Sequence, residues 1–184
     1  MRQTQRDSRP GKLRVAVWVG LSDKKCLEKL RGLQECDMVR EGLLIRRHPV
    51  DGLESFTQIC PPAALRFSAL LSHLYALLIS IPACLRFGPD VCVGISMIPH
   101  SLLARLGQAA SGARFVNWVI GTDLYLELRD TWWGRALRPL MRSASATLCM
   151  GSRSKEELVS MGWQPDRVFL GRNAYDLSDY ENRS

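Results

Sequence analysis

Several motifs that would identify a function at once are missing from this 184-residue chain. It has no CxxC pair and only three histidines, which are far apart, so the sequence gives no metal site. It has neither a P-loop nor a GxGxxG fingerprint for phosphate binding. No helix-turn-helix, zinc or aromatic-interleaved basic pattern is present, which disfavours nucleic acid as a partner. We therefore expect neither a metal nor another cofactor.

What the chain does have is an ordinary globular composition, with 46% hydrophobic and 23% charged residues. That balance excludes wholesale disorder, collagen-like repeats and coiled coil. The cysteines are scattered, and no apolar stretch follows the basic start closely enough to form a signal peptide. We therefore expect a reducing, cytoplasmic compartment in which the thiols are free and mostly fill the core. The six cysteines are Cys26, Cys36, Cys60, Cys84, Cys92 and Cys149.

The positive charge is concentrated at the start of the chain. Of the net charge of +7, most comes from the first 50 residues, which hold 12 basic and 6 acidic side chains. Low hydrophobicity and high charge predict that residues 1–12 form a disordered, solvated arm. The alternative is weak attraction of this arm to an anionic membrane surface.

Short apolar runs alternate with helical patterns along the rest of the chain. The strands predicted from these runs are Leu13–Val19, part of Met38–Arg46, Val91–Ile95, Arg114–Ile120, Thr147–Met150 and Arg167–Leu170. The segment Asp51–Pro62 has turn residues and no clear period, so it is predicted to be a loop. Because the strands are apolar without alternation, the pattern predicts an α/β fold: a doubly wound, Rossmann-like, mostly parallel sheet with helices on both faces.

The helices have recognisable start and stop signals. They are predicted from Ser22 to about Leu33, from Pro62 through an apolar run, from Pro99, within Leu128–Ser143, and from a capping box at Ser154–Glu157 to Met161, where Gly162 ends the helix. The run after Pro62 contains His73 and has only 15 residues between Arg66 and Pro82, too few for a bilayer core of about 30 Å. We expect a buried or interfacial helix there.

Ligands of such sheets bind at the carboxyl ends of the strands, near a topological switch point. Four polar clusters follow predicted strands, namely Gly20–Asp23, Ser96–His100, Gly121–Asp123 and Gly151–Arg153. Helix amino ends at such positions suit a phosphate or a sugar hydroxyl, whereas turn formation alone is the alternative explanation for each cluster. At a helix start His100 is expected to be neutral, either as a binding group or as a surface residue, and His73 to be partly buried and satisfied.

Two long stretches carry an ordered series of these signals. GPDVCVGISMIPHSLLARLGQAASGARFVNWVIGTDL runs strand, helix, strand and Gly-Thr-Asp, and ASATLCMGSRSKEELVSMGWQPDRVFLGRNAYD runs strand, Ser, capped helix, Gly and a closing Asn-Ala-Tyr-Asp. In this order they resemble the amino-terminal domain of retaining glycosyltransferases with the GT-B fold, specifically the family 4 type. The resemblance implies two domains facing across a cleft, of which the first binds the acceptor and the second holds the nucleotide-sugar and the glutamate pair that contacts it.

The resemblance also implies roles for individual residues. Gly20 would lie in the glycine loop beside the donor phosphates, Gly121–Asp123 on the cleft floor, Ser152 at the next strand end, and Asn173 where the chain crosses to the second domain. The full set expected to bind substrate is Gly20, Ser22, His100, Gly121, Thr122, Asp123, Ser152, Arg153 and Asn173. No catalytic residue is assigned.

The sequence departs from the family pattern in several places. Gly20 stands in Gly-Leu-Ser-Asp without paired glycines, Ile120 replaces the usual histidine before Gly-Thr-Asp, and the closing motif after Gly171 lacks its usual Pro and Gly. A complete enzyme is expected to have roughly twice this length, so residues 13–176 are expected to be one Rossmann-like half and residues 177–184 the start of the interdomain linker.

Three functions therefore remain open. The first is the acceptor-binding half of a glycosyltransferase that moves a sugar from a nucleotide-sugar to a glycan or lipid, expected to be inactive without a donor-binding domain or subunit. The second is a non-catalytic module in which Leu65–Ile81 and Trp132–Arg142 dock a partner protein or the cytoplasmic face of a membrane, although the tryptophans and arginines equally fit core and solvent positions. The third is a small α/β enzyme acting on a nucleotide or phosphate ester.

Overall fold

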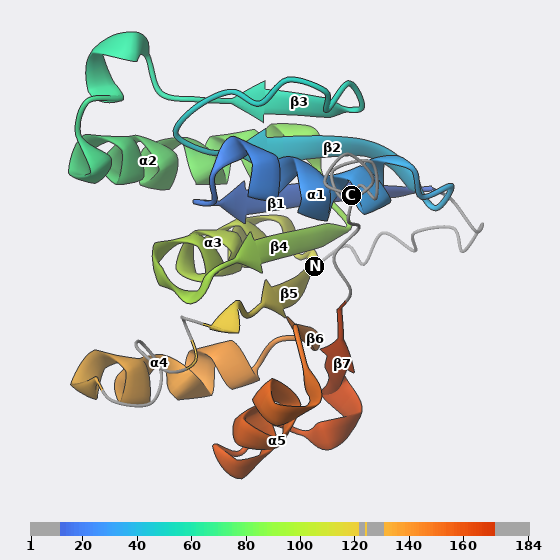
Figure 1. The fold of residues 1–184 in the computed structure, drawn as a ribbon. Helices are drawn as coiled ribbons and strands as arrows, with labels where there is room; N and C mark the ends of the chain where they lie inside the picture. Colours follow the sequence, from blue (N-terminus) through green and yellow to red (C-terminus); the bar gives the residue numbers. More distant parts are fainter. Residues whose placement is uncertain (1–11, 122–123, 125–130, 172–184) are drawn as a thin grey trace, which may run out of the picture.

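Seven short strands pair side by side into one parallel sheet (Figure 1). The computed structural model describes residues 12–121, 124 and 131–171, so the predicted arm, except for Lys12, and the tail 177–184 lie outside the described residues. The order is β3-β2-β1-β4-β5-β6-β7 and every pair is parallel. The strands are β1 Leu13–Val19, β2 Val39–Ile45, β3 Phe56–Ile59, β4 Val91–Ile95, β5 Arg114–Trp118, β6 Ala146–Cys149 and β7 Val168–Leu170. The predicted Rossmann-like sheet is confirmed.

Within the described residues, five α-helices cover the two faces of this sheet. They are α1 Asp23–Gln34, α2 Ala69–Phe87, α3 Leu102–Ser111, α4 Trp132–Arg142 and α5 Ser152–Ser160. On one face, Cys26 and Leu30 of α1 pack against inward side chains of β1, β2 and β4. On the other, Cys84 of α2 and Leu103 of α3 belong to the second core cluster, with Met141 of α4. The chain changes direction between β1 and β4, which is the switch point at which α/β sheets bind ligands.

The packing of α2 and α3 against β1 centres on Trp18. This side chain is fully buried, and its indole Nε1 donates a hydrogen bond of 2.9 Å to the hydroxyl of Ser80, which is also fully buried. Gly107 of α3 lies against the same ring, because a Cβ atom added there would be 2.6 Å from Trp18 Cη2 and 2.8 Å from Cys84 Sγ. Absence of a side chain at Gly107 therefore lets the two helices close over the tryptophan.

The expected loop Asp51–Pro62 contains a strand, so that prediction was wrong. Strand β3 pairs with β2 at the edge of the sheet, where Phe56 lies opposite Gly42. The side chain of Gln58 binds both backbone groups of Val50, accepting from its N–H at 2.9 Å and donating to its carbonyl at 2.6 Å. A four-residue edge strand with polar side chains has no apolar run, which is why the sequence pattern missed it.

The helix expected from Pro62 begins later and ends later than predicted. A short 3₁₀ turn, Ala63–Leu65, precedes Ser68, whose hydroxyl caps α2 by accepting from the Leu71 N–H at 3.4 Å. Proline 82 does not stop the helix, because the carbonyl that loses its donor belongs to Leu78 on an exposed part of α2. At 19 residues and a mean hydropathy of 1.6, α2 is long and apolar enough to cross a membrane, which corrects the length argument, and only 17% of its apolar window is buried.

The carboxyl-terminal helix also starts differently. Helix α5 begins at Ser152, with Gly151 at the N-cap position and no side-chain capping hydrogen bond. The capping box predicted at Ser154 was therefore wrong. The predicted stop is confirmed, because Gly162 has a φ of +95°, a left-handed conformation that glycine adopts at little cost.

Candidate functional site

The candidate site is a cavity of about 380 Å³ at the carboxyl edge of the sheet, beside the switch point. Strand β1 ends at Val19 and β4 ends at Ile95, and these two residues are paired. Because both strands run in the same direction, the segments that leave them, Gly20 and Ser96, open onto the same edge. The ends of β1, β2 and β4 and the first turns of α2 therefore surround one hollow.

His100 lies directly over Gly20. A Cβ atom built on Gly20 would be 2.2 Å from His100 Cε1 and 2.7 Å from its Nε2, so only glycine leaves room for the imidazole. The turn that carries His100 is fixed by the buried hydroxyl of Ser101, which lies 2.7 Å from Oδ1 of buried Asn117 and 2.8 Å from the carbonyl oxygen of Ser96. The imidazole is thus held in place by the strand beneath it and by the turn behind it.

Arg46 supplies a buried positive charge at the end of β2. One of its terminal nitrogens, Nη2, donates to the carbonyl of Leu21 at 3.0 Å and to Oδ1 of Asp23 at 2.7 Å. The other, Nη1, is buried and has no hydrogen-bond partner among the described residues. Since Asp23 is 68% exposed, its carboxylate compensates the charge of the Arg46 guanidinium from the solvent side.

Two imidazole rings that line the cavity contact each other. The rings of His73, from α2, and His100 make an edge-to-face contact with centroids 5.8 Å apart. Burial, followed by His73 and Arg46, lowers the pKa of His100 to about 4, and burial followed by Arg47 lowers the pKa of His73. Imidazole Nδ1 of His100 is buried without a hydrogen-bond partner among the described residues. At neutral pH His100 is therefore an uncharged group with hydrogen-bonding capacity to spare.

The described residues that line the cavity include two arginines and no carboxylate. The second arginine, Arg47, donates its Nε to the backbone carbonyl of Arg66 at 2.7 Å, which anchors the guanidinium near the start of α2. A positive, partly enclosed hollow without an acidic side chain favours an anionic ligand such as a phosphate or a carboxylate. In the described part of the chain no group of three His, Cys, Asp or Glu side chains is placed to hold a metal ion.

The structure brings together two of the residues expected to bind substrate, Gly20 and His100. Ser22 is exposed at the start of α1 and its side chain makes no capping hydrogen bond. Gly121 is described, with no atom within 4 Å of a Cβ placed on it. Thr122, Asp123 and Asn173 lie outside the described residues.

Ser152 and Arg153 are exposed at the start of α5, at the end of β6. Strand β6 is three places from β1 in the sheet, which separates the two by about 14 Å at ordinary strand spacing. Arg153 faces Glu157 one helical turn on, with Nε 3.9 Å from Oε1. These two residues therefore lie along the same edge without lining the cavity at Gly20.

Sequence analysis missed four polar residues of this cavity, namely Arg46, Arg47, Ser72 and His73. The arginine pair directly follows the apolar end of β2 and was therefore at the expected carboxyl edge. No pattern connected His73 with His100, because their contact depends on the packing of α2 against α3.

No protein family model matches this sequence, and no curated protein matches it. Solved structures do match its fold. The HepE protein of Anabaena in complex with UDP-glucose superposes with a TM-score of 0.61 at 9% identity, over 91% of this chain and 46% of that one. The UDP-GlcNAc 2-epimerase of Methanocaldococcus jannaschii superposes with a TM-score of 0.58 at 13% identity, over 88% of this chain and 45% of that one.

The lipopolysaccharide outer core galactosyltransferase WaaB, in its apo form, gives a TM-score of 0.54 at 15% identity, over 85% of this chain and 44% of that one. The chain thus spans less than half the length of each of these three structures. These similarities show a shared Rossmann-like fold of the GT-B type.

Proposed function

We propose that this chain is the acceptor-binding half of a glycosyltransferase that moves a sugar from a nucleotide-sugar to a glycan or lipid acceptor. The observation that carries the proposal is the positive cavity without carboxylates at the switch point, formed around Gly20, Arg46 and His100. The fold supports it, because the three matching structures are named as a complex with UDP-glucose, a UDP-GlcNAc epimerase and a galactosyltransferase. In each the matched part is less than half of the longer chain.

The contents of the cavity favour acceptor binding over donor binding. The space above Gly20, where a nucleotide phosphate would approach a glycine loop, is filled by the His100 ring. An uncharged imidazole and a buried guanidinium are suited to orient an acceptor that carries hydroxyl groups and a negative charge. Catalysis needs charge-stabilising dipoles on both sides of the reacting atoms in a site that excludes water, and a second domain or subunit would supply the other side. The described half on its own is expected to transfer no sugar.

A binding experiment tests this proposal on the isolated chain. Its histidine resonances are followed by NMR while UDP-glucose or glucose 1-phosphate is added. The sugar phosphate is expected to shift the His73 and His100 resonances saturably, whereas UDP-glucose is expected to bind with a Kd above about 1 mM. The matched control is Gly32→Ala, which lies on α1 outside the cavity and has nothing described within 4 Å of the new methyl group, against Gly20→Val, which fills the position of His100. Micromolar UDP-glucose binding, or sugar transfer by the chain alone, would contradict the proposal and favour the small-enzyme alternative.

A second candidate is peripheral docking at the cytoplasmic face of a membrane. Helix α2 exposes a series of large apolar side chains, with Leu78 at 77%, Leu70 at 68% and Leu85 at 61%. The acidic residues are absent from α2, α3 and α4, in which every charged side chain is an arginine. Apolar surface beside arginines is what an anionic bilayer binds.

Co-sedimentation with vesicles tests the membrane candidate. Phosphatidylglycerol vesicles are expected to retain the chain in low salt and to release much of it at 0.5 M salt, where the Debye length falls to about 4 Å. Phosphatidylcholine vesicles are the matched control. The double variant Leu78→Asn, Leu85→Asn is expected to weaken retention at least fivefold. Equal binding to both vesicle types would exclude a contribution of the anionic lipid charge. Absence of binding to either type would contradict membrane docking altogether.

A further inference from the structure

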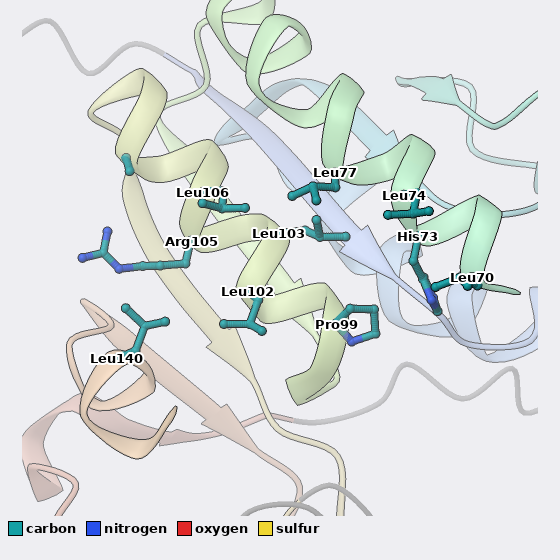
Figure 2. Close-up of a pocket in the computed structure, with 11 residues that line it drawn as sticks. Leu70, His73, Leu74, Leu77, Pro99, Leu102, Leu103, Arg105, Leu106 and Leu140 are labelled. Carbon is teal, nitrogen blue, oxygen red and sulfur yellow. The ribbon is translucent and has the colours of Figure 1, made fainter. Parts of the chain in front are cut away.

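A second cavity of about 560 Å³ lies beside the polar one, in a groove between α2 and α3. Figure 2 shows leucines of the two helices facing each other across it, with Leu77 of α2 opposite Leu103 of α3. The α2 side is completed by Leu70 and Leu74, and the guanidinium of Arg105 extends away from α2. This surface is apolar yet open to solvent, since Leu74 is 46% exposed and Leu77 is 40% exposed.

The groove adjoins the polar cavity. His73, Pro99 and Leu103 line both, so the two cavities meet near the first turns of α2. From Leu70 to Leu77 the groove follows two turns of α2, about 10 Å at the rise of an α-helix. A polar cavity thus lies directly beside an apolar groove.

The polar end carries positive charge. The Arg46 side chain is only 5% exposed and is paired with the exposed carboxylate of Asp23, and His100 Nδ1 is buried without a hydrogen-bond partner among the described residues. The described lining of this end includes Arg46 and Arg47 and no acidic residue. Two guanidinium groups without an acidic side chain in the lining favour an anionic oxygen at this end.

We propose that the two cavities together bind one amphiphile, with a phosphate-type head group beside Arg46 and its alkyl chain in the leucine groove between α2 and α3. As an acceptor this ligand would be a lipid-linked phosphate, and that assignment rests on the proposed function. The binding itself does not, because it depends only on the two adjoining cavities. Positive charge at one end and apolar lining at the other specify both ends of the ligand.

Calorimetry on the full chain tests the proposal with decyl phosphate below its micelle concentration. Binding is expected with one molecule per chain. Hexyl phosphate is expected to bind at least tenfold more weakly, since each methylene removed from water strengthens binding about fourfold. Decyltrimethylammonium, which has the same chain and the opposite charge, is expected to bind at least tenfold more weakly too. Equal affinity for the two decyl compounds would overturn the head-group assignment.

Two neighbouring leucines give a matched pair of variants. Leu77 lines the groove, whereas Leu78 is 77% exposed on the same helix and is not part of it. Leu77→Asn is expected to weaken decyl phosphate binding at least tenfold, and Leu78→Asn less than twofold. Equal losses would indicate general adhesion to the apolar face and overturn the proposal. Because both side chains are exposed, both variants are expected to fold, which circular dichroism checks.

A second pair of variants tests the head-group end of the site. Arg46→Met changes a residue of the polar cavity, and Arg86→Met is the control, because Arg86 does not line that cavity. Only the first is expected to weaken decyl phosphate binding, by at least tenfold, and equal losses would overturn the role of Arg46. If Arg46→Met does not fold, the leucine pair still decides.

A final comparison distinguishes a bilayer phospholipid from a single-chain lipid-linked phosphate as the ligand. Dihexanoyl phosphatidic acid stands for a bilayer phospholipid, and decyl phosphate for a single-chain lipid-linked phosphate. Preference for either one supports the site and identifies its source, whereas failure of both to bind overturns it. Amphiphile binding together with failure of the sugar-phosphate titration would leave this inference standing while the proposed function fails.

Discussion

The imidazole of His100 occupies the space in which any side chain at position 20 would begin. A Cβ atom on Gly20 would lie 2.2 Å from Cε1 of the ring, far inside van der Waals contact. The glycine that ends β1 and the histidine that follows β4 therefore depend on each other across the switch point. Both residues line the cavity.

Substitution of Gly20 by alanine is expected to displace His100 and to destabilise the fold by about 1 to 3 kcal/mol, the usual range for overpacking. Urea unfolding measures the free energy, and the chemical shift of the His100 ring reports its displacement. Gly121→Ala is the control, because no atom lies within 4 Å of its added methyl group. Equal stability of the two variants would show that the imidazole yields freely.

Stability is expected to fall as the solution is acidified from about pH 6.5 to pH 4. Burial, His73 and Arg46 lower the pKa of His100 from 6.5 to about 4, so in this window the unfolded chain binds more protons than the folded one. The free energy of unfolding therefore rises with pH across the window, by an amount on the order of 3 kcal/mol. Urea unfolding at several pH values measures this slope.

The His100→Asn variant is expected to flatten that slope, whereas His48→Asn, at an exposed position, is expected to retain it. An unchanged slope in His100→Asn would assign the pH dependence to other groups.

Removal of the Ser80 hydroxyl is expected to cost about 1 to 3 kcal/mol. In Ser80→Ala the fully buried indole N–H of Trp18 loses its acceptor at 2.9 Å and has no access to water. Thermal unfolding followed by tryptophan fluorescence measures the loss. The exposed Ser160, whose hydroxyl bonds to the Glu157 carbonyl, is the control, and Ser160→Ala is expected to change stability by less than about 0.5 kcal/mol.

Two helical glycines are expected to respond to alanine with opposite signs. In Gly32→Ala nothing lies within 4 Å of the new methyl group, so helix propensity alone is expected to stabilise the protein by about 0.5 to 1 kcal/mol. In Gly107→Ala the methyl group meets Trp18 and Cys84, and the overpacking is expected to outweigh the same gain. Chemical denaturation of both variants checks the signs. Stabilisation by both would mean that α3 can move away from α2.

The buried centre of the fold was predictable from sequence because its strands are uninterrupted apolar runs. Leu13–Val19 and Val91–Ile95 are observed with the predicted limits. The edge strand Phe56–Ile59 was not, because only one of its faces is buried and its polar residues resemble a turn. The local sequence pattern thus predicts the central strands of the sheet better than its edge strand.

The candidate site was predictable only in part, for a related reason. The rule for strand ends selected Gly20 and His100, which line one cavity, and the predicted neutrality of His100 agrees with its lowered pKa. The expected reason for this neutrality, a position at a helix start, was wrong. Burial is the largest cause of the lowered pKa, and α3 begins only at Leu102. Arg46 directly follows β2 and so lies where the strand-end rule applies, whereas His73 enters the cavity through long-range packing, of which a linear sequence gives no signal.

The parallel pairing of β1 with β4 has a consequence for synthesis of the chain. Val19 and Ile95 are neighbours in the sheet, yet β2, β3 and α2 lie between them in sequence. The hollow at Gly20 therefore has no wall until roughly the first hundred residues have left the ribosome, and earlier nascent chains expose the leucines of α2 without the cover of α3. Such chains are the ones for which a chaperone would matter most.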